Sequence, residues 1–176
     1  MFYRTRTYIA ADWDHDRDVV DKLLEWNQSS NCSLEFSYAH DLMQARDESL
    51  YCSIKKSLRE RLNGSKTFVL IAGAETTRVT KGGCQYCQSY NSCARYCVKG
   101  MYVDYRSYIE YECELATKIW EEGKMDIVVI YKGIHTHNDW IFEILSGKGI
   151  HIPAYYLDSF GNKFWNKQKI VDTLMN

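Results

Sequence analysis

The sequence lacks the features of several common functional classes. Lysine and arginine total 22 against 23 aspartate and glutamate residues, which argues against a nucleic-acid binder whose affinity rests on a strongly basic surface. No window approaches the roughly 20 apolar residues of a membrane span, and the opening MFYRTRTYIAADWD has no apolar run long enough for a signal peptide. We therefore expect a soluble cytoplasmic protein that binds neither nucleic acid nor membranes.

Proline and linker-like sequence are also scarce. Pro153 is the single proline, and no low-complexity stretch or internal repeat divides the 176 residues. A chain of this length can enclose one full hydrophobic core. We expect one domain over residues 1–176, with residues 83–100 as a cysteine-rich insertion after the third strand.

Apolar runs of strand length alternate with segments of helical periodicity along the chain. Strands are predicted at 6–11, 34–38, 67–71, 126–131 and 150–157, and helices at 16–26, 47–62, 105–121, from 138, and at 163–174. This alternation predicts an α/β fold with a five-stranded, parallel, flavodoxin-like sheet flanked by helices. Ligands of such sheets bind at the carboxyl ends of the strands.

Glu112 has an unusual place in the helix predicted over residues 105–121. The apolar stripe of this helix faces the sheet, and Glu112 lies within it, four residues after Tyr108 and three before Leu115. An unpaired carboxylate at such a position is strongly disfavoured. Two interpretations stay open: an ion pair with Arg106 or Arg46, or a functional carboxylate that faces a ligand crevice.

The loop after the first predicted strand reads Asp12-Trp13-Asp14-His15-Asp16 and contains no glycine. The glycine-rich dinucleotide fingerprint and the Walker phosphate loop are therefore absent. Asp12 and Trp13 are candidate substrate-binding residues, because Trp13 suits stacking on a base or a nicotinamide ring. The alternative is that Asp16 caps the first helix and Trp13 covers the sheet edge.

A second loop follows the strand predicted at 34–38. Its segment 41–47 ends in Arg46 and Asp47, whose charges suit polar contacts with a dinucleotide. We expect this segment to close over the substrate, with Arg46 and Asp47 among the substrate-binding residues.

Three stretches carry a resemblance to a known family. The first strand with its acidic loop, the segment SIKKSLRERLNGSKTFVLIAGAETT and the run YRSYIEYECELATKIWEEGKMDIVVI resemble the TIR-like domains of bacterial defence, most closely the ThsB-type component of Thoeris systems. In that family a Trp-x-x-x-Glu helix start carries the catalytic glutamate. The matching residues here are Tyr108 to Glu112, with tyrosine in place of tryptophan. The resemblance extends over residues 6–131 and is most specific over 105–131.

The resemblance implies an NAD-consuming enzyme with Glu112 as the catalytic carboxylate and Tyr108 beside the substrate. Such domains release nicotinamide and make ADP-ribose or a cyclised or conjugated derivative, which serves a separate effector protein as a signal. The resemblance also implies assembly into a homo-oligomer or filament. The chemistry agrees, because cleavage of the N-glycosidic bond creates an oxocarbenium-like ribose that a fixed carboxylate stabilises.

Other functions compete with this interpretation. A nucleoside deoxyribosyltransferase-like enzyme also sets a glutamate against a ribosyl centre. A non-catalytic TIR-like scaffold would signal by contact, with Glu112 paired to an arginine. A phosphoacceptor receiver domain is disfavoured, because the third strand ends Ile71-Ala72-Gly73-Ala74 and supplies no aspartate.

Four of the seven cysteines fall within the predicted insertion. Cys84 and Cys87 have C-x2-C spacing, and Cys93 and Cys97 have C-x3-C spacing. Four thiolates so close in sequence can enclose one tetrahedral zinc ion, whereas disulfides are not expected in a reducing compartment. Unligated cysteines in a tyrosine-rich loop, an iron–sulfur cluster and a redox switch are the alternatives, and in each case the insertion is expected to lie beside the pocket as a lid.

Overall fold

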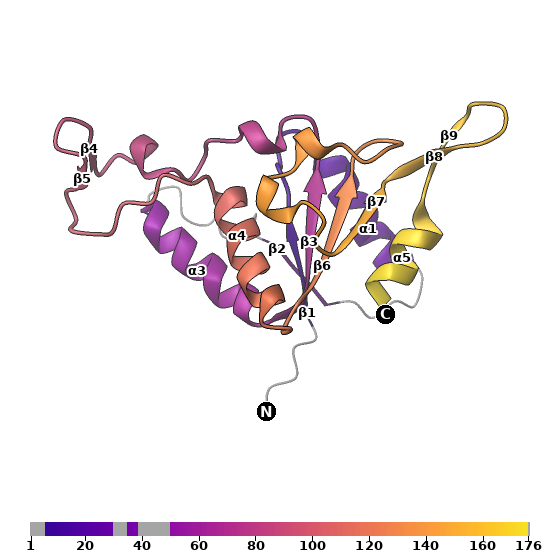
Figure 1. The fold of residues 1–176 in the computed structure, drawn as a ribbon, viewed down its shortest axis with the longest axis horizontal. Coiled ribbons are helices and arrows are strands. Elements are labelled where there is room, and N and C mark those ends of the chain that lie inside the picture. Colours follow the sequence, from indigo (N-terminus) through magenta and orange to yellow (C-terminus); the bar gives the residue numbers. More distant parts are fainter. Residues whose placement is uncertain (1–5, 30–34, 39–49, 176) are drawn as a thin grey trace.

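A computed structural model describes residues 6–29, 35–38 and 50–175. Five strands form one parallel sheet in the order β2-β1-β3-β6-β7 (Figure 1). The strands are β1 (Arg6–Ala10), β2 (Glu35–Tyr38), β3 (Ser65–Ala72), β6 (Asp126–Tyr131) and β7 (Ile150–Pro153). This is the flavodoxin-like order, with its switch point between β1 and β3. The predicted five-stranded parallel α/β fold is confirmed.

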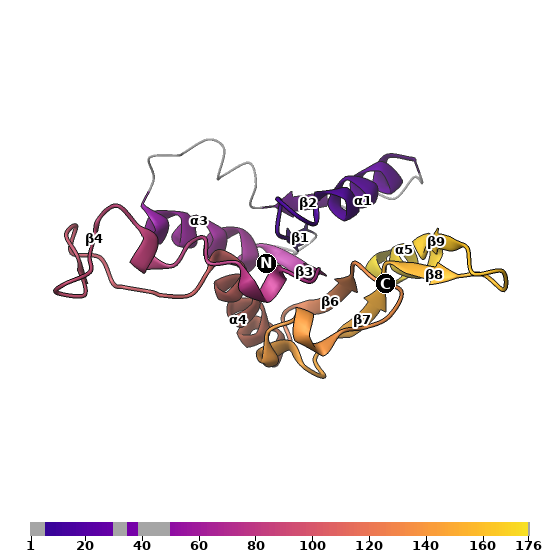
Figure 2. The ribbon, with the colours of Figure 1, turned by 90° about the horizontal axis from the view of Figure 1, so that it is seen from above.

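Two pairs of helices cover the two faces of this sheet. On one face lie α3 (Tyr51–Asn63) and α4 (Tyr108–Glu121), and on the other lie α1 (Arg17–Ser29) and α5 (Lys167–Met175) (Figures 1 and 2). Successive side chains of a strand point to opposite faces. Tyr8 of β1 therefore packs with α3 and α4, whereas the next residue, Ile9, packs with α1 and α5.

The limits of α4 follow from local signals in the sequence. The Ser107 hydroxyl accepts a hydrogen bond from the Glu110 backbone N–H at 3.1 Å, which makes Ser107 the N-cap. Gly123, with a φ of 67°, follows the last turn in the left-handed conformation that glycine adopts without strain. The helix therefore begins at Tyr108 rather than at residue 105, and Glu112 lies in its second turn.

The C-terminal region differs from the prediction for residues 150–174. After Pro153, which ends the edge strand β7, the chain leaves the sheet and forms an antiparallel hairpin of β8 (Tyr155–Leu157) and β9 (Lys163–Trp165). The Asp158 carboxylate closes the hairpin loop by accepting backbone N–H bonds from Phe160 and Asn162, both at 2.8 Å. Because β9 takes residues 163–165, α5 begins only at Lys167.

The prediction of a helix from Asn138 is also wrong. This segment forms two 3-10 turns, η3 (Asn138–Trp140) and η4 (Glu143–Leu145), and no side chain caps either turn. The buried residues Ile141 and Leu145 fix the segment against the face that carries α3 and α4. The packing of these two side chains therefore holds the segment in place, whereas the sequence pattern predicted a regular helix.

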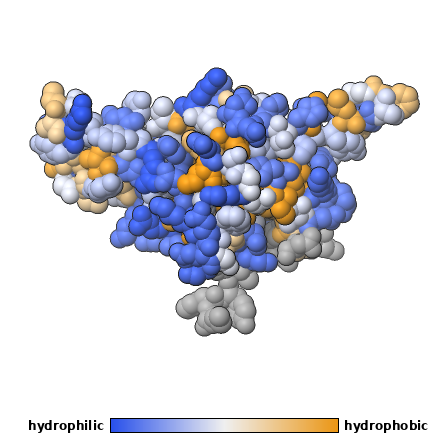
Figure 3. Space-filling model, viewed as in Figure 1, coloured by the Kyte–Doolittle hydropathy of each residue, from blue (hydrophilic) through white to orange (hydrophobic). Residues whose placement is uncertain are grey.

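Two projections extend from opposite ends of the molecule (Figure 1). One is the β8–β9 hairpin. The other, here called the cysteine arm, follows η1 (Thr76–Arg78) and contains η2 (Cys84–Tyr86), β4 (Tyr90–Asn91) and β5 (Tyr96–Cys97). Figure 3 shows a mostly hydrophilic surface between the projections, with apolar residues interspersed. No helix in the described part of the chain is long and apolar enough to cross a membrane.

Candidate functional site

Glu112 lies between α4 and the sheet, as its place in the apolar stripe predicts. The residue is 2% exposed, and the hydroxyl of Tyr8 donates a hydrogen bond to its carboxyl Oε1. Tyr8 is itself fully buried in β1, and its ring stacks on Phe68 of β3 with centroids 6.1 Å apart. The carboxyl of Glu112 is therefore held from the sheet by a fully buried side chain.

Burial dominates the ionisation of Glu112. Removal from water raises the pKa of this carboxyl from 4.5 to about 8, and the hydrogen bond from Tyr8 opposes part of the rise. At neutral pH the group is thus mostly protonated in the folded protein. A carboxyl whose pKa lies near the working pH is typical of functional sites.

Arg106, one predicted partner of Glu112, binds other carboxylates. Its guanidinium contacts Asp104 through Nε–Oδ1 at 2.9 Å and Nη2–Oδ2 at 2.7 Å, and contacts Glu114 through Nη1–Oε2 at 2.5 Å. The buried Lys55 completes this network, with its Nζ 3.3 Å from Asp104 Oδ1. The proposed Glu112–Arg106 ion pair is therefore not formed, and the network instead fixes the chain that leads into α4.

A second group of polar side chains lies at the carboxyl end of β1. Asp12 is 8% exposed and accepts hydrogen bonds from the Asp14 backbone N–H at 3.1 Å and from His15 Nδ1 at 2.7 Å. The bond with Asp12 raises the pKa of His15. Trp13 packs partly buried against the face that carries α1 and α5. Asp12 and Trp13 thus lie near the switch point, where ligands of such sheets bind.

Asp16 is the most buried carboxylate of this second group, at 1% exposure. Its Oδ2 accepts a hydrogen bond from the Thr76 hydroxyl at 3.4 Å, and Lys132 Nζ lies 3.9 Å from Oδ1. Burial raises its pKa to about 6, while Lys132 opposes the shift. Asp16 therefore binds across the ends of β1, β3 and β6. It also occupies the N-cap position of α1, where its backbone carbonyl accepts hydrogen bonds from the Val19 and Val20 N–H groups at 3.1 and 3.4 Å.

Gly73 makes this position of Asp16 possible. A Cβ atom added at Gly73 would lie 2.3 Å from Asp16 Oδ1, far inside van der Waals contact. A side chain at position 73 would therefore force the buried Asp16 carboxylate to shift.

Tyr108 is buried at the start of α4, at 4% exposure, where its ring meets that of Tyr51 edge-on at 5.7 Å. Its hydroxyl has no hydrogen-bond partner among the described residues. Burial raises the pKa of this phenol, and Tyr51, Cys87, Cys84 and Cys52 add to the rise.

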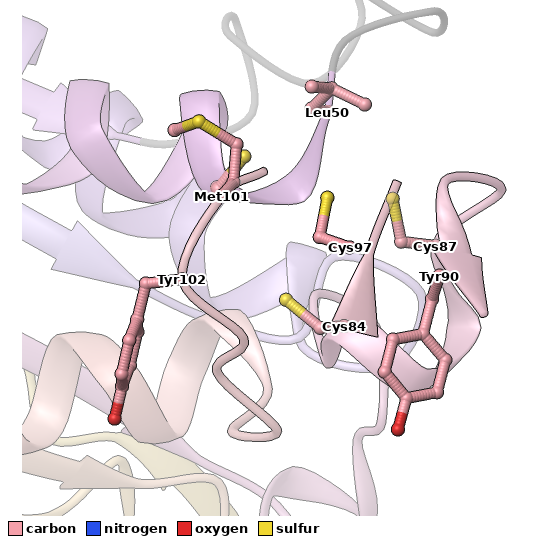
Figure 4. Close-up of a pocket in the computed structure, with 8 residues that line it drawn as sticks. Leu50, Cys84, Cys87, Tyr90, Cys97, Met101 and Tyr102 are labelled. Carbon is pink, nitrogen blue, oxygen red and sulfur yellow. The ribbon is translucent and has the colours of Figure 1, made fainter. Parts of the chain in front are cut away.

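The four cysteines predicted as zinc ligands are not assembled as a metal site. Across the described ranges, no three His, Cys, Asp or Glu side chains are placed to hold an ion. Cys84, Cys87 and Cys97 line one pocket together with Cys52 of α3 (Figure 4), whereas Cys93 is exposed and is not among the lining residues. The reason is the β4–β5 hairpin, which leaves Cys93 in its turn.

Two predicted substrate-binding residues, Arg46 and Asp47, lie outside the described residues, as does the whole segment 41–47. The structure thus brings Glu112 to Tyr8 and places Asp12 and Trp13 at the switch point. It buries Tyr108 in the same helix stripe as Glu112.

Comparison with known proteins bears on the first part of the chain. Residues 8–81 match the family model of the Thoeris protein ThsB, TIR-like domain. The resemblance to the Thoeris TIR-like family is confirmed. The ThsB match begins within β1, includes α1, β2, α3 and β3, and ends before η2 and α4. It covers somewhat less than half of the chain. Glu112 therefore lies outside the residues matched to ThsB. No curated protein matches the sequence.

Sequence reasoning missed Tyr8, Thr76 and Lys132. Tyr8 stands in a short apolar strand, where a tyrosine is ordinarily a packing residue, and its hydroxyl finds Glu112 only through the fold. Thr76 follows β3 and Lys132 follows β6. Their position after neighbouring parallel strands is the one feature of the sequence that could have indicated their place near the ligand-binding end of the sheet.

Proposed function

We propose that the protein cleaves the nicotinamide–ribose bond of NAD, as an NAD nucleosidase or cyclase, with Glu112 as the catalytic carboxylate. The observation that carries this proposal is the buried carboxyl of Glu112, bonded to Tyr8 on the sheet and raised in pKa to about 8. The match of residues 8–81 to the ThsB TIR-like domain supports the same activity class.

The charge of NAD suits this carboxyl. The pyridinium ring of NAD is cationic, and a cation beside a carboxyl lowers its pKa. Binding of NAD therefore favours the carboxylate form, which then stabilises the positive charge that develops on the ribose as nicotinamide leaves. Because nicotinamide departs as a neutral molecule, the reaction needs no general acid at the leaving group.

Access to Glu112 is part of the proposal. The residue is 2% exposed, so contact with the ribose requires local opening between β1 and α4. Asp12 and Trp13, at the carboxyl end of β1, are the proposed contacts for the rest of the dinucleotide. Arg46 and Asp47 keep their proposed role in substrate binding. The proposed product is ADP-ribose or a cyclised or conjugated derivative, acting in the cytoplasm on a separate effector.

The test is nicotinamide release from NAD by the full chain, with products separated by mass spectrometry. Glu112→Gln should abolish release, whereas Glu110→Gln, two residues away on the less buried side of α4, should retain it. Product mass distinguishes hydrolysis from cyclisation. Equal release by the wild type and Glu112→Gln would remove Glu112 from its role. Cleavage of a deoxyribonucleoside but not of NAD would favour a deoxyribosyltransferase.

If the wild type releases no nicotinamide even at high protein concentration and with a triggering stimulus, the non-catalytic scaffold becomes the better account. Oligomeric state should be measured in the same samples, because a homo-oligomer or filament is a proposed active form.

A further inference from the structure

The pocket between α3 and the cysteine arm is lined by four thiols from two separate segments. Cys52 lies in the first turn of α3, and Cys84, Cys87 and Cys97 come from the arm. Leu50, Tyr90, Met101 and Tyr102 form the rest of its wall. Figure 4 shows the labelled Cys84, Cys87 and Cys97 around one space. Four free thiols around one largely apolar space are an unusual arrangement for packing alone.

The backbone explains why Cys97, and not Cys93, joins Cys84 and Cys87. Cys87 closes the 3-10 turn η2 with its N–H 2.9 Å from the Cys84 carbonyl. Three residues later the hairpin begins, and its register pairs Tyr90 with Cys97. This pairing returns Cys97 to the base of the arm beside Cys87. Cys93 lies beyond the hairpin strands and is exposed.

One backbone donor reaches a sulfur of this pocket. The Asp104 backbone N–H donates to Cys84 Sγ at 3.3 Å. The Lys55 ammonium donates a hydrogen bond to the Asp104 carbonyl at 3.2 Å, so it lies next to the residue whose N–H reaches Cys84.

We propose that this pocket binds one Zn²⁺ ion through Cys52, Cys84, Cys87 and Cys97. Four thiolates match the tetrahedral coordination that structural zinc prefers. The Asp104 N–H acts as an outer donor to the Cys84 thiolate. The ion would tie the cysteine arm to α3, next to the start of the helix that carries Glu112.

The thiols must turn to reach the ion. The described side chains do not form a coordination sphere as they stand. Rotation about χ1 moves a cysteine sulfur between staggered positions without moving the backbone. All four residues already line one pocket, and the proposal requires such rotations together with loss of the thiol protons to solvent.

The test uses the full chain, purified under reducing conditions, and measures bound zinc and the visible spectrum after Co²⁺ substitution. We expect one ion per chain and the intense thiolate-to-cobalt bands of a tetrahedral site. Cys52→Ser should lose these bands, and Cys93→Ser, the matched control, should keep them.

A second measurement needs no variant and covers the case in which Cys52→Ser does not fold. The wild type is treated with a thiol-alkylating reagent with and without added Zn²⁺, and the modified cysteines are mapped by mass spectrometry. Zinc should protect Cys52, Cys84, Cys87 and Cys97 but not Cys93. Protection of Cys93 in place of Cys52 would assign the ion to the arm alone and overturn the proposal. Absence of zinc uptake and of any protection would overturn it as well.

Discussion

Glu112→Gln should make the protein more stable at neutral pH while removing its activity. The folded pKa of Glu112 is raised from 4.5 to about 8, mainly by burial. The stabilising contribution of this group is thus present below pH 4.5 and is lost as the pH rises through 8. Glutamine has similar volume, stays neutral at every pH, and can accept the same hydrogen bond from Tyr8.

The magnitude follows from the two pKa values. A tenfold difference in proton affinity corresponds to about 1.4 kcal/mol, so between pH 4.5 and pH 7 the wild type loses about 3 kcal/mol of unfolding free energy through this group. Relative to wild type, Glu112→Gln should gain less than about 1 kcal/mol at pH 5 and about 3 kcal/mol at pH 7.

Urea unfolding at pH 5, 7 and 8 measures this difference, and Glu110→Gln on the same helix is the control. We expect the gain in unfolding free energy to grow with pH for Glu112→Gln alone. A loss of stability at pH 7, or a difference that does not change with pH, would refute the reasoning. Either result would indicate that Glu112 is a charged, paired structural residue.

Three further predictions follow from contacts of named residues. Tyr8→Phe removes the hydrogen bond that lowers the pKa of Glu112, so the pH profile of NAD cleavage should move to higher pH, and an unmoved profile would contradict the positioning role of Tyr8. Gly73→Ala should destabilise the protein by about 1–3 kcal/mol in urea unfolding, because its Cβ would strike Asp16. The same change should have little effect in an Asp16→Ala background, and an equal effect there would rule out this clash as the cause. The hydrogen bonds from Arg106 and the charge of Lys55 outweigh burial and lower the pKa of Asp104 to about 2, so its contribution to stability is present above pH 3.8 and lost as pH falls towards 2. In Asp104→Asn the unfolding free energy should therefore fall less steeply with decreasing pH in this acidic range than it does in the wild type. An equal fall in both proteins would argue against this network.

The sheet and the position of Glu112 could be predicted from the sequence because both depend on local periodicity. The apolar runs of β3 and β6 indicate strands buried on both faces. The 3.6-residue period of α4 places Glu112 on the stripe that faces the sheet, and the structure confirms that burial. Each inference uses a pattern contained within one element.

The partners of the site could not be predicted in the same way. Tyr8 and Glu112 are 104 residues apart in sequence, and their contact depends on which face of β1 carries Tyr8 and on where α4 crosses the sheet. Cys52 joins the arm cysteines only because α3 lies beside the arm, whereas sequence spacing favoured the neighbouring Cys93. The β8–β9 hairpin depends on the Asp158 turn, a side-chain contact that periodicity does not report.

The most direct test of the central claim is the pH dependence of kcat/KM for NAD, which reports the pKa values of the free enzyme. If buried Glu112 is the catalytic carboxylate, kcat/KM should rise as pH increases and level off above a pKa of about 8. A profile that is already level above pH 5, as for an ordinary solvated glutamate, would contradict the account.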